Sequence, residues 1–365
     1  MAGRNRKPVS CKQIQEIAVN KIELLNTKKN NSEIISSDTS TPPKEKIAKC
    51  IACDCSAFDL LYKVRDTNQG VSGQWNLMAC RECGLGVLDP FPSQDQVASF
   101  YVDDFYTADG KRFQGWVEKL RGILAWMRGI GLNRAASAKG RLLDFGAGAG
   151  HFARVQEERG WEVYAVDPYS GKATSGDVCE QDGDRIKLKF PNHYFDVVTL
   201  WYVIEHLRDP ALAIAEFYRI LKPGGILVLA QQDFASVQAR LFGTRWLILD
   251  PPRHIWQFKE HNLLKLVARY NFKKISISHS SIELGPFTIL QSILNCLVGN
   301  ENYLFCLLKN GGLQSKNKVK KDIPLGRAIA SIVLGVCLFP VSIVIYFLLL
   351  SLGSGDVFTL YLRRE

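Results

Sequence analysis

Two short apolar runs frame a cluster of glycines near the middle of the chain, in RLLDFGAGAGHFARVQEERGWEVYAVD, residues 141–167. The first run, Leu142–Phe145, has the length and composition of a buried strand, and a segment of helical period follows the glycines. The second run, Trp161–Val166, ends at Asp167. The pattern predicts a strand, a tight turn, a helix and a second strand, in that order.

The apolar pattern continues with strands that alternate with helices. Strands are predicted at Phe195–Trp201, Ile226–Ala230, Asn271–Ser278 and Asp356–Leu362, and helices at Ala211–Leu221 and Lys259–Tyr270. The first of these helices should stop at Lys222-Pro223-Gly224-Gly225. We expect an α/β sheet whose last strand pairs antiparallel beside Ile275–Ser278.

The N-terminal third of the chain has a different character. Residues 1–46 are rich in Lys, Asn, Ser and Thr, which predicts a disordered basic arm. A weakly amphipathic run near Ile14–Leu25 leaves open a helix that binds a partner or a membrane. Residues 91–140, with a helix at Lys111–Leu132, should cover the sheet.

An apolar segment, residues 281–354, interrupts the sheet before its last strand. Ala328–Leu352 carries no charge and exceeds the ~20 residues that span a bilayer, and a weaker run covers Phe287–Leu308. The strands that flank the segment belong to one sheet, so an odd number of crossings is excluded. Two spans, a re-entrant hairpin broken near Pro340, or helices in the interface remain, and we favour the last two. The alternative is a buried subdomain or a dimer interface.

The net charge of +10 is concentrated outside the predicted sheet. Basic residues gather in the first 50 positions and between Lys309 and Arg327, next to the apolar segment. Neither basic run has interleaved aromatic residues, so we expect an anionic membrane surface as partner and no nucleic acid. No apolar signal core follows the N-terminus. The protein is expected in the cytoplasm, peripheral or re-entrant at the inner face of the cell membrane.

Five of the ten cysteines lie in two tight clusters, which favours a metal in a reducing compartment over disulfides. Their order is Cys50-x-x-Cys53, then Cys55, then Cys80-x-x-Cys83. Two such pairs predict a structural zinc held by Cys50, Cys53, Cys80 and Cys83 in a ribbon over residues 47–90. Cys55 could replace Cys53, and unliganded thiols are the alternative. Strands are predicted at Phe58–Val64 and Gln74–Met78.

The glycine turn distinguishes two classes of nucleotide-binding fold. A dinucleotide fingerprint, G-x-G-x-x-G, would place its third glycine at His151, whereas the chain has D-x-G-x-G-x-G from Asp144 to Gly150. That loop, with an acid closing the next strand, resembles class I S-adenosylmethionine-dependent methyltransferases. The resemblance implies a Rossmann-like seven-stranded sheet with residues 91–140 over the cofactor. A glycine turn that serves packing alone is the alternative.

The resemblance extends to later segments, GDRIKLKFPNHYFD, WYVIEHLRDP and LKPGG. It implies a cofactor site formed by Asp144, Gly146, Ala147, Gly148, Gly150, Asp167, Pro168, Asp184, Arg185 and Trp201. Asp177 and Asp182 compete with Asp184 for the adenine amino group. The resemblance also places His254, in PPRHIWQF, in a loop that closes the substrate pocket.

Candidate catalytic residues follow the strand Phe195–Trp201. Ligands of open α/β sheets bind beyond the carboxyl ends of strands, which puts Glu205 and His206 near the transferred methyl. His206 or His254 could take a proton from the acceptor, and each could instead only orient its loop. We expect methyl transfer to a lipid, quinone-like ring or lipid-linked sugar, with the acceptor's identity and the oligomeric state left open. A membrane-bound scaffold with a vestigial cofactor pocket is the rival from another class, and a nicotinamide oxidoreductase is disfavoured by the glycine spacing.

Overall fold

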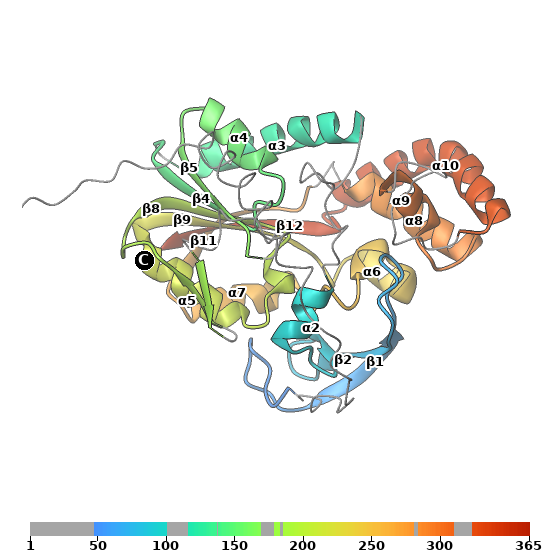
Figure 1. The fold of residues 1–365 in the computed structure, drawn as a ribbon, viewed down its shortest axis with the longest axis horizontal. Helices are drawn as coiled ribbons and strands as arrows, with labels where there is room; N and C mark the ends of the chain where they lie inside the picture. The colour runs from blue at the N-terminus through green and yellow to red at the C-terminus, as the bar shows by residue number, and fades with distance from the viewer. Residues whose placement is uncertain are drawn as a thin grey trace, which may run out of the picture.

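The computed structural model describes residues 47–100, 116–136, 138–168, 179–182, 185–280, 284–309 and 323–365. The predicted basic arm, residues 1–46, therefore lies outside the described residues. The described chain forms a central sheet with helices on both faces, a small sheet built mainly from the N-terminal segment, and a group of helices beside them (Figure 1).

The central sheet has strand order β11-β12-β9-β8-β4-β5. Strands β5, β4, β8 and β9 run parallel to one another, and β12 pairs antiparallel with both β9 and β11. The bounds are β4 Arg141–Phe145, β5 Glu162–Val166, β8 Phe195–Trp201, β9 Leu221–Gln232, β11 Phe272–Ser278 and β12 Val357–Arg364. The Rossmann-like α/β fold and the antiparallel last strand are confirmed.

Two expectations about the sheet need correction. The described residues contribute six strands to it rather than seven, because β6 (Cys179–Asp182) pairs with β7 (Arg185–Leu188) in a separate ladder. Strand β9 also begins earlier than predicted. Leu221 already pairs with Phe195, and the Pro-Gly-Gly stretch is accommodated as an irregularity in the pairing, with Gly224 at a φ of 76°.

Helices cover the two faces of the sheet in pairs. Helices α3 and α4 lie on one face and α5 and α7 on the other (Figure 1). Asp209 caps α5 by accepting a 2.9 Å hydrogen bond from the amide of Leu212. The bounds are α3 Trp116–Ala135, α4 His151–Glu158, α5 Pro210–Ile220 and α7 Glu260–Ala268, with short helices at α2 Gln94–Ser99, α6 Val237–Phe242, η1 Ile204–His206, η2 Gly243–Arg245 and η3 Leu247–Leu249.

The cysteine-bearing ribbon is completed by a strand from the core. Strands β1 (Phe58–Val64), β2 (Trp75–Cys80) and β3 (Gly86–Asp89) form an antiparallel sheet, which β10 (Trp256–Gln257) extends at its edge. The indole of Trp256 in turn donates a 2.9 Å hydrogen bond to the carbonyl of Leu207, just after η1. The ribbon is thus part of the same packed unit as the segment that follows β8.

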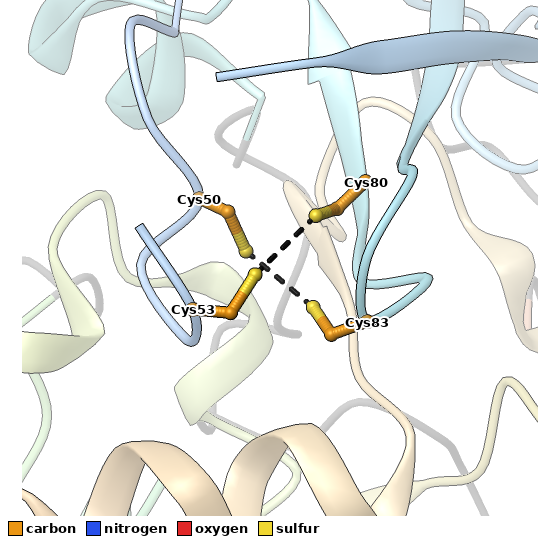
Figure 2. A group of neighbouring side chains, drawn as sticks. All are labelled: Cys50, Cys53, Cys80 and Cys83. Carbon is orange, nitrogen blue, oxygen red and sulfur yellow. Dashed lines mark hydrogen bonds between the residues drawn. The ribbon is translucent and has the colours of Figure 1, made fainter. Parts of the chain in front are cut away.

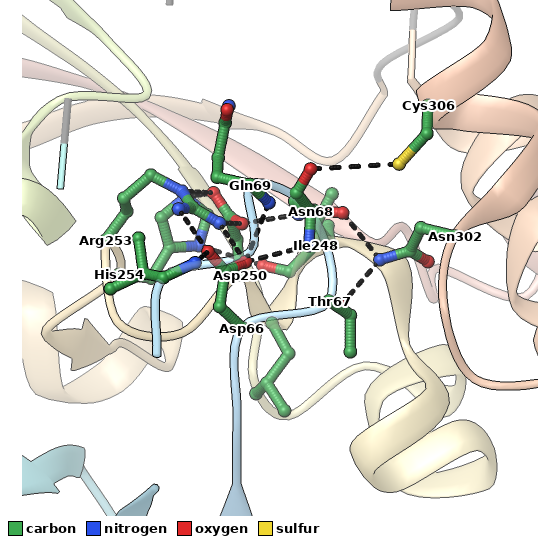
Figure 3. Close-up of polar contacts among 12 residues, drawn as sticks. Asp66, Thr67, Asn68, Gln69, Ile248, Asp250, Arg253, His254, Asn302 and Cys306 are labelled. Atoms are coloured by element: carbon green, nitrogen blue, oxygen red, sulfur yellow. Dashed lines mark hydrogen bonds and ion pairs between the residues drawn. The ribbon is translucent and has the colours of Figure 1, made fainter. Parts of the chain in front are cut away.

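A buried ion-pair network joins the ribbon to the core loop before β10. Arg253 is 2% exposed and donates to both carboxylate oxygens of Asp66, at 3.1 and 2.8 Å, and of Asp250, at 3.0 and 2.5 Å (Figure 3). Asp66 also accepts hydrogen bonds from three backbone amides of its own loop, including that of Val71 at 2.9 Å. Bidentate pairs of this kind fix both the position and the orientation of the two loops that they join.

The same ribbon loop contacts the apolar segment. The side-chain amide of Asn302 donates to Thr67 at 2.8 Å and to Asn68 at 2.6 Å (Figure 3). Asn68 also donates to Asp250 at 2.5 Å. One loop of the ribbon therefore binds the core loop and the helical segment at the same time.

The apolar segment forms three described helices, α8 (Gly285–Leu297), α9 (Tyr303–Lys309) and α10 (Leu325–Ser351). Helix α10 runs unbroken through Pro340, so the re-entrant hairpin broken near Pro340 is wrong. Gly285 of α8 lies against the ring of Tyr346, where a Cβ atom would overlap it. Among the described residues, α10 is the one helix whose length and composition would allow a membrane crossing, with a mean hydropathy of 2.8.

We expect Arg253→Met to lower the free energy of unfolding by about 3–5 kcal/mol, because it leaves buried carboxylates without their partner. Burial would raise the pKa of Asp250, but the charge and hydrogen bonds of Arg253 hold it well below its usual range. A depressed pKa stabilises the fold above the unfolded-state value of about 3.9, and this contribution is lost as the pH falls below it. Urea unfolding at pH 7 and at stepwise lower pH measures both effects.

Arg81→Met is the matched control, since Arg81 pairs with Asp59 at 2.6 Å where both side chains are 61% exposed. Its stability should stay within error of the unsubstituted protein. Equal effects of the two substitutions would contradict the structural role given to the buried network.

Candidate functional site

In the glycine turn between β4 and α4, the backbone lies close to two other segments of the chain, at Val166 and Val203. Gly146 has a φ of 79°, and a Cβ atom there would overlap the side chain of Val203. Its amide donates a 2.7 Å hydrogen bond to the carbonyl of Val166. Gly150 caps α4 in the left-handed region, with a φ of 73°. Only glycine satisfies both the conformation and the space at position 146.

The acid that ends β5 faces this turn. The amide of Gly148 donates a 2.7 Å hydrogen bond to Oδ2 of Asp167. The amide of Ala147 contacts the carbonyl of Val166 at 3.2 Å, and Pro168 continues the chain next to Asp167. The structure therefore brings Gly146, Ala147, Gly148, Gly150 and Asp167 together, as the sequence predicted.

Asp144 lies beneath the turn. It is 2% exposed and accepts a 3.0 Å hydrogen bond from the hydroxyl of Thr199 on the neighbouring strand. Burial raises the pKa of Asp144 to about 7, against the lowering effects of Thr199 and Arg128. This hydrogen bond makes Asp144 a contact between β4 and β8 within the sheet.

Trp201 is the last residue of β8, the strand that pairs with β4. Its ring lies 5.1 Å from that of Phe152, and the guanidinium of Arg128 lies 5.2 Å from the ring centre. The indole N–H is buried and has no hydrogen-bond partner among the described residues. A buried donor without a partner is uncommon, and a bound polar ligand would satisfy it.

Two predicted cofactor residues cannot be located relative to the turn. Asp184 lies outside the described residues, as does its competitor Asp177. Arg185 begins β7, but its side chain is outside the described part of the structure.

The three predicted catalytic side chains meet at one point. Glu205, His206 and His254 each offer a ligand atom, and these atoms lie within 4.8 Å of one another. The two imidazole ring centres are 4.7 Å apart, and Nε2 of His254 lies 4.0 Å from Oε1 of Glu205. Glu205 and His206 belong to η1 after β8, whereas His254 comes from the loop before β10.

Backbone carbonyls orient both imidazole rings. Nδ1 of His206 lies 2.9 Å from the carbonyl oxygen of Arg253, and Nδ1 of His254 lies 2.9 Å from that of Ile248. A carbonyl oxygen only accepts, so Nδ1 carries the proton and Nε2 keeps the lone pair in each neutral ring. Nε2 of the Gln232 amide lies 2.8 Å from Nδ1 of His254, and a half-turn of that amide presents its oxygen to the N–H instead.

Glu205 is the most unusual group of this cluster. Its side chain is completely buried, and neither carboxylate oxygen makes a hydrogen bond of good geometry to a described residue. Burial raises the pKa of Glu205 to about 8, and the nearby amide of Gln232 offsets only part of this rise. Such a carboxyl group is a common feature of functional sites.

A second candidate centre lies in the ribbon. The sulfurs of Cys50 and Cys83 are 3.5 Å apart, as are those of Cys53 and Cys80, and all four converge (Figure 2). An ion about 2.3 Å from four sulfurs in tetrahedral geometry would separate them by about 3.8 Å. The cluster therefore has the size of a tetrathiolate metal site.

Cys55 is not part of this cluster, which answers the question left open between Cys53 and Cys55. The sulfur of Cys55 instead accepts a 3.3 Å hydrogen bond from the amide of Ala57. Burial raises the pKa of the Cys50 thiol, and raises that of Cys83 to about 11. Bound zinc would compensate the negative charge of buried thiolates.

A cavity of about 240 Å³ lies away from both centres, between the ribbon and the loop that precedes β10. Its lining includes Lys63, Arg65, Thr244 and Asn300, and none of the glycine-turn residues. The glycine turn and the Glu-His-His cluster are the candidate site, because convergent polar groups and buried donors mark a site more specifically than volume does.

Sequence reasoning missed several residues that shape the site. Thr199 and Arg128 contact the surroundings of the turn, and Asp66, Asp250 and Arg253 hold the loop of His254. A Thr inside an apolar strand was a weak signal for Thr199. The Asp66–Arg253 pair is separated by 187 positions in the sequence and gave no local signal.

Comparison with known proteins adds a family match. Residues 119–277 match the model of a protein family described as a methyltransferase domain. A malonyl-acyl-carrier-protein O-methyltransferase of Serratia marcescens is 32% identical over 126 residues, which make up 32% of this chain and 48% of that protein. A demethylmenaquinone methyltransferase of Renibacterium salmoninarum is 35% identical over 97 residues, 25% of this chain and 40% of that protein.

The chain spans about half the length of the curated relatives it matches. Among solved structures, a methyltransferase of Thermotoga maritima described as a possible histamine N-methyltransferase has a TM-score of 0.39 at 15% identity. It covers 74% of this chain and 99% of its own.

Proposed function

We propose that this chain, which contains a class I S-adenosylmethionine-dependent methyltransferase domain within residues 119–277, binds the cofactor at its glycine turn and methylates an acceptor held at Glu205, His206 and His254. At the level of the family, the resemblance deduced from D-x-G-x-G-x-G is confirmed. The acceptor and the roles of individual residues are part of the proposal.

The observation that carries the proposal is the contact between the glycine turn and Asp167. A carboxylate at the end of β5 that faces backbone amides of the turn is positioned to accept hydrogen bonds from ribose hydroxyls beside it. The buried indole N–H of Trp201 offers a further donor. When bound, S-adenosylmethionine supplies a methyl group on a positively charged sulfur, which leaves as a neutral thioether.

The rest of the catalytic task falls to the protein. The acceptor must lie in line with the methyl group, and an acceptor hydroxyl must lose a proton. Contact between Gly146 and Val203 places the turn next to η1, which carries Glu205 and His206. The neutral imidazole of His206 or His254 presents Nε2 as a proton acceptor. Relatives that act on demethylmenaquinone and on malonyl-acyl-carrier protein favour an acceptor with carbonyl or hydroxyl oxygens.

We further propose that α10 lies in the lipid headgroup interface, so that the acceptor is membrane-embedded. A broad apolar stripe is exposed along α10, at Leu325, Ile329, Ile332, Val333, Val336, Phe339, Val341, Val344, Phe347 and Leu348. Because β11 and β12 pair in one sheet, a single crossing between them is excluded. Membrane attachment by a helix in the interface satisfies both observations.

The four-cysteine cluster is proposed to bind a structural zinc ion. All four positions are occupied by sulfur, which leaves no open position for catalysis. Gly84 turns the second knuckle with a φ of 66°, and His261 of α7 contacts the carbonyl of Cys83 at 2.9 Å. The metal would fix the ribbon against the core.

We expect the full chain to bind S-adenosylmethionine in isothermal titration calorimetry, and Asp167→Ala to weaken this binding at least about tenfold. Hydrogen bonds to a charged group contribute about 1.5–3 kcal/mol, and 1.4 kcal/mol corresponds to a factor of ten. Glu158→Ala, which removes an exposed acid at the end of α4, should leave the affinity unchanged. Absence of binding at millimolar cofactor would exclude the proposed enzyme.

We expect the purified chain to float with vesicles that contain phosphatidylglycerol, and Val336→Glu to reduce the bound fraction several-fold. A charge on the apolar stripe would have to enter the lipid. Leu241→Glu on α6 is a matched control, because Leu241 and Val336 are both 72% exposed. Equal loss of flotation in both variants, or self-association of the chain in place of flotation, would argue against a lipid-facing α10.

We expect about one zinc ion per chain by atomic absorption, and Cys50→Ser to lose it together with part of the thermal stability. Cys55→Ser should keep the zinc, because its sulfur lies outside the cluster. A chain without zinc, or equal loss in the two variants, would contradict the assignment.

A further inference from the structure

A buried carboxylate and two oriented imidazoles form an arrangement that the proposed methyl transfer does not by itself require. Glu205, His206 and His254 bring their ligand atoms within 4.8 Å of one another, on two segments that are remote in sequence. Glu205 is 0% exposed, and its carboxylate oxygens make no hydrogen bond of good geometry within the described structure. Burying an unsatisfied carboxyl group is costly, so its retention calls for a partner.

The two histidines are oriented as metal ligands usually are. In each ring Nδ1 lies 2.9 Å from a backbone carbonyl, that of Arg253 for His206 and that of Ile248 for His254. A hydrogen bond from Nδ1–H to a carbonyl fixes the tautomer whose Nε2 can bind a cation, and it raises the basicity of that atom. Nε2 of His254 lies 4.0 Å from Oε1 of Glu205 and 4.0 Å from Oδ2 of Asp250.

We propose that Glu205, His206 and His254 bind a divalent cation of the first transition series, such as zinc or ferrous iron. Two imidazoles and one carboxylate are a ligand set that such cations take in enzymes, with open positions for other ligands. The 4.0 Å separation of His254 and Glu205 requires the side chains to close by a fraction of an ångström around an ion about 2.1 Å from each.

The position of the site suggests what occupies the open coordination positions. Glu205 and His206 follow Val203, whose side chain contacts the glycine turn. The cation would therefore lie next to the cofactor and bind oxygen atoms of the acceptor, such as a phenol or an enolised dicarbonyl. Its charge would lower the pKa of the acceptor hydroxyl, so the hydroxyl would lose its proton to water, and the Nε2 atoms bound to the cation would not serve as the base. This part of the inference rests on the proposed function, whereas cation binding does not.

The loop of His254 is held in place independently of any cation. Arg253 binds Asp250 and Asp66 in the buried network, and Ile255 donates a 3.0 Å backbone hydrogen bond to the carbonyl of Glu205. A site whose ligands are fixed before the ion arrives binds it with little reorganisation. The neighbouring Asp250 is engaged by Arg253, which leaves Glu205 as the carboxylate for the ion.

The test uses the full chain, purified with zinc in its cysteine cluster and freed of other metal by dialysis, and titrated with CoCl₂. We expect calorimetry to detect one additional Co²⁺ per chain, with weak visible bands typical of nitrogen and oxygen ligands. Strong near-ultraviolet bands from thiolate ligands would instead report exchange at the cysteine cluster. Glu205→Gln and His254→Ala should each weaken Co²⁺ binding at least about tenfold.

His279→Ala is the matched control, because His279 also contacts a glutamate, Glu260, at 3.1 Å but outside this cluster. It should bind Co²⁺ as the unsubstituted chain does. Zinc content and thermal unfolding of each variant report whether it is folded.

The cation site is overturned if no Co²⁺ binds beyond the cysteine cluster, or if both Glu205→Gln and His254→Ala bind it unchanged. Co²⁺ binding in a chain that does not bind S-adenosylmethionine would retain the cation site and reject the proposed function. Cofactor binding without Co²⁺ binding would reject the cation site and retain the proposed function.

Discussion

The buried pairing of Arg253 with Asp66 and Asp250 is the constraint on which the arrangement of the molecule depends. A guanidinium that is 2% exposed must keep its carboxylate partners, because a buried charge left unpaired is strongly destabilising. One partner, Asp66, comes from the ribbon, and the other, Asp250, from the core loop that carries His254. The ribbon can therefore not shift without moving that loop.

This constraint gives the cysteine ribbon a structural role beyond its own fold. Its sheet gains β10 from the core, and the same loop that carries Asp66 contacts Asn302 in the apolar segment (Figure 3). The ribbon thereby connects the four-cysteine cluster, the loop of His254 and the helical group. We infer that the ribbon serves to hold the loop of His254 in place.

The glycine turn and the segment that carries Glu205 and His206 meet through a second contact, that of Gly146 with Val203. The lack of a Cβ atom at position 146 allows η1 to approach the turn closely. Glu205 and His206 are carried on that element, so the contact of the Val203 side chain with position 146 sets the spacing between the glycine turn and these two residues. The pairing of β11 with β12 constrains the apolar segment between them, because it holds both ends of that segment at the same sheet.

The sequence by itself determined the α/β order, the glycine turn, the acid at position 167 and the two cysteine pairs, because each is a local pattern of a few residues. It also determined which strands flank the apolar segment. Only the tertiary structure decided that β9 starts at Leu221, that α10 continues through Pro340, and that Cys53 rather than Cys55 joins the cluster. It alone brought Asp66 to Arg253 and His254 to Glu205, because such contacts depend on how distant segments pack and leave no periodic signal in the chain.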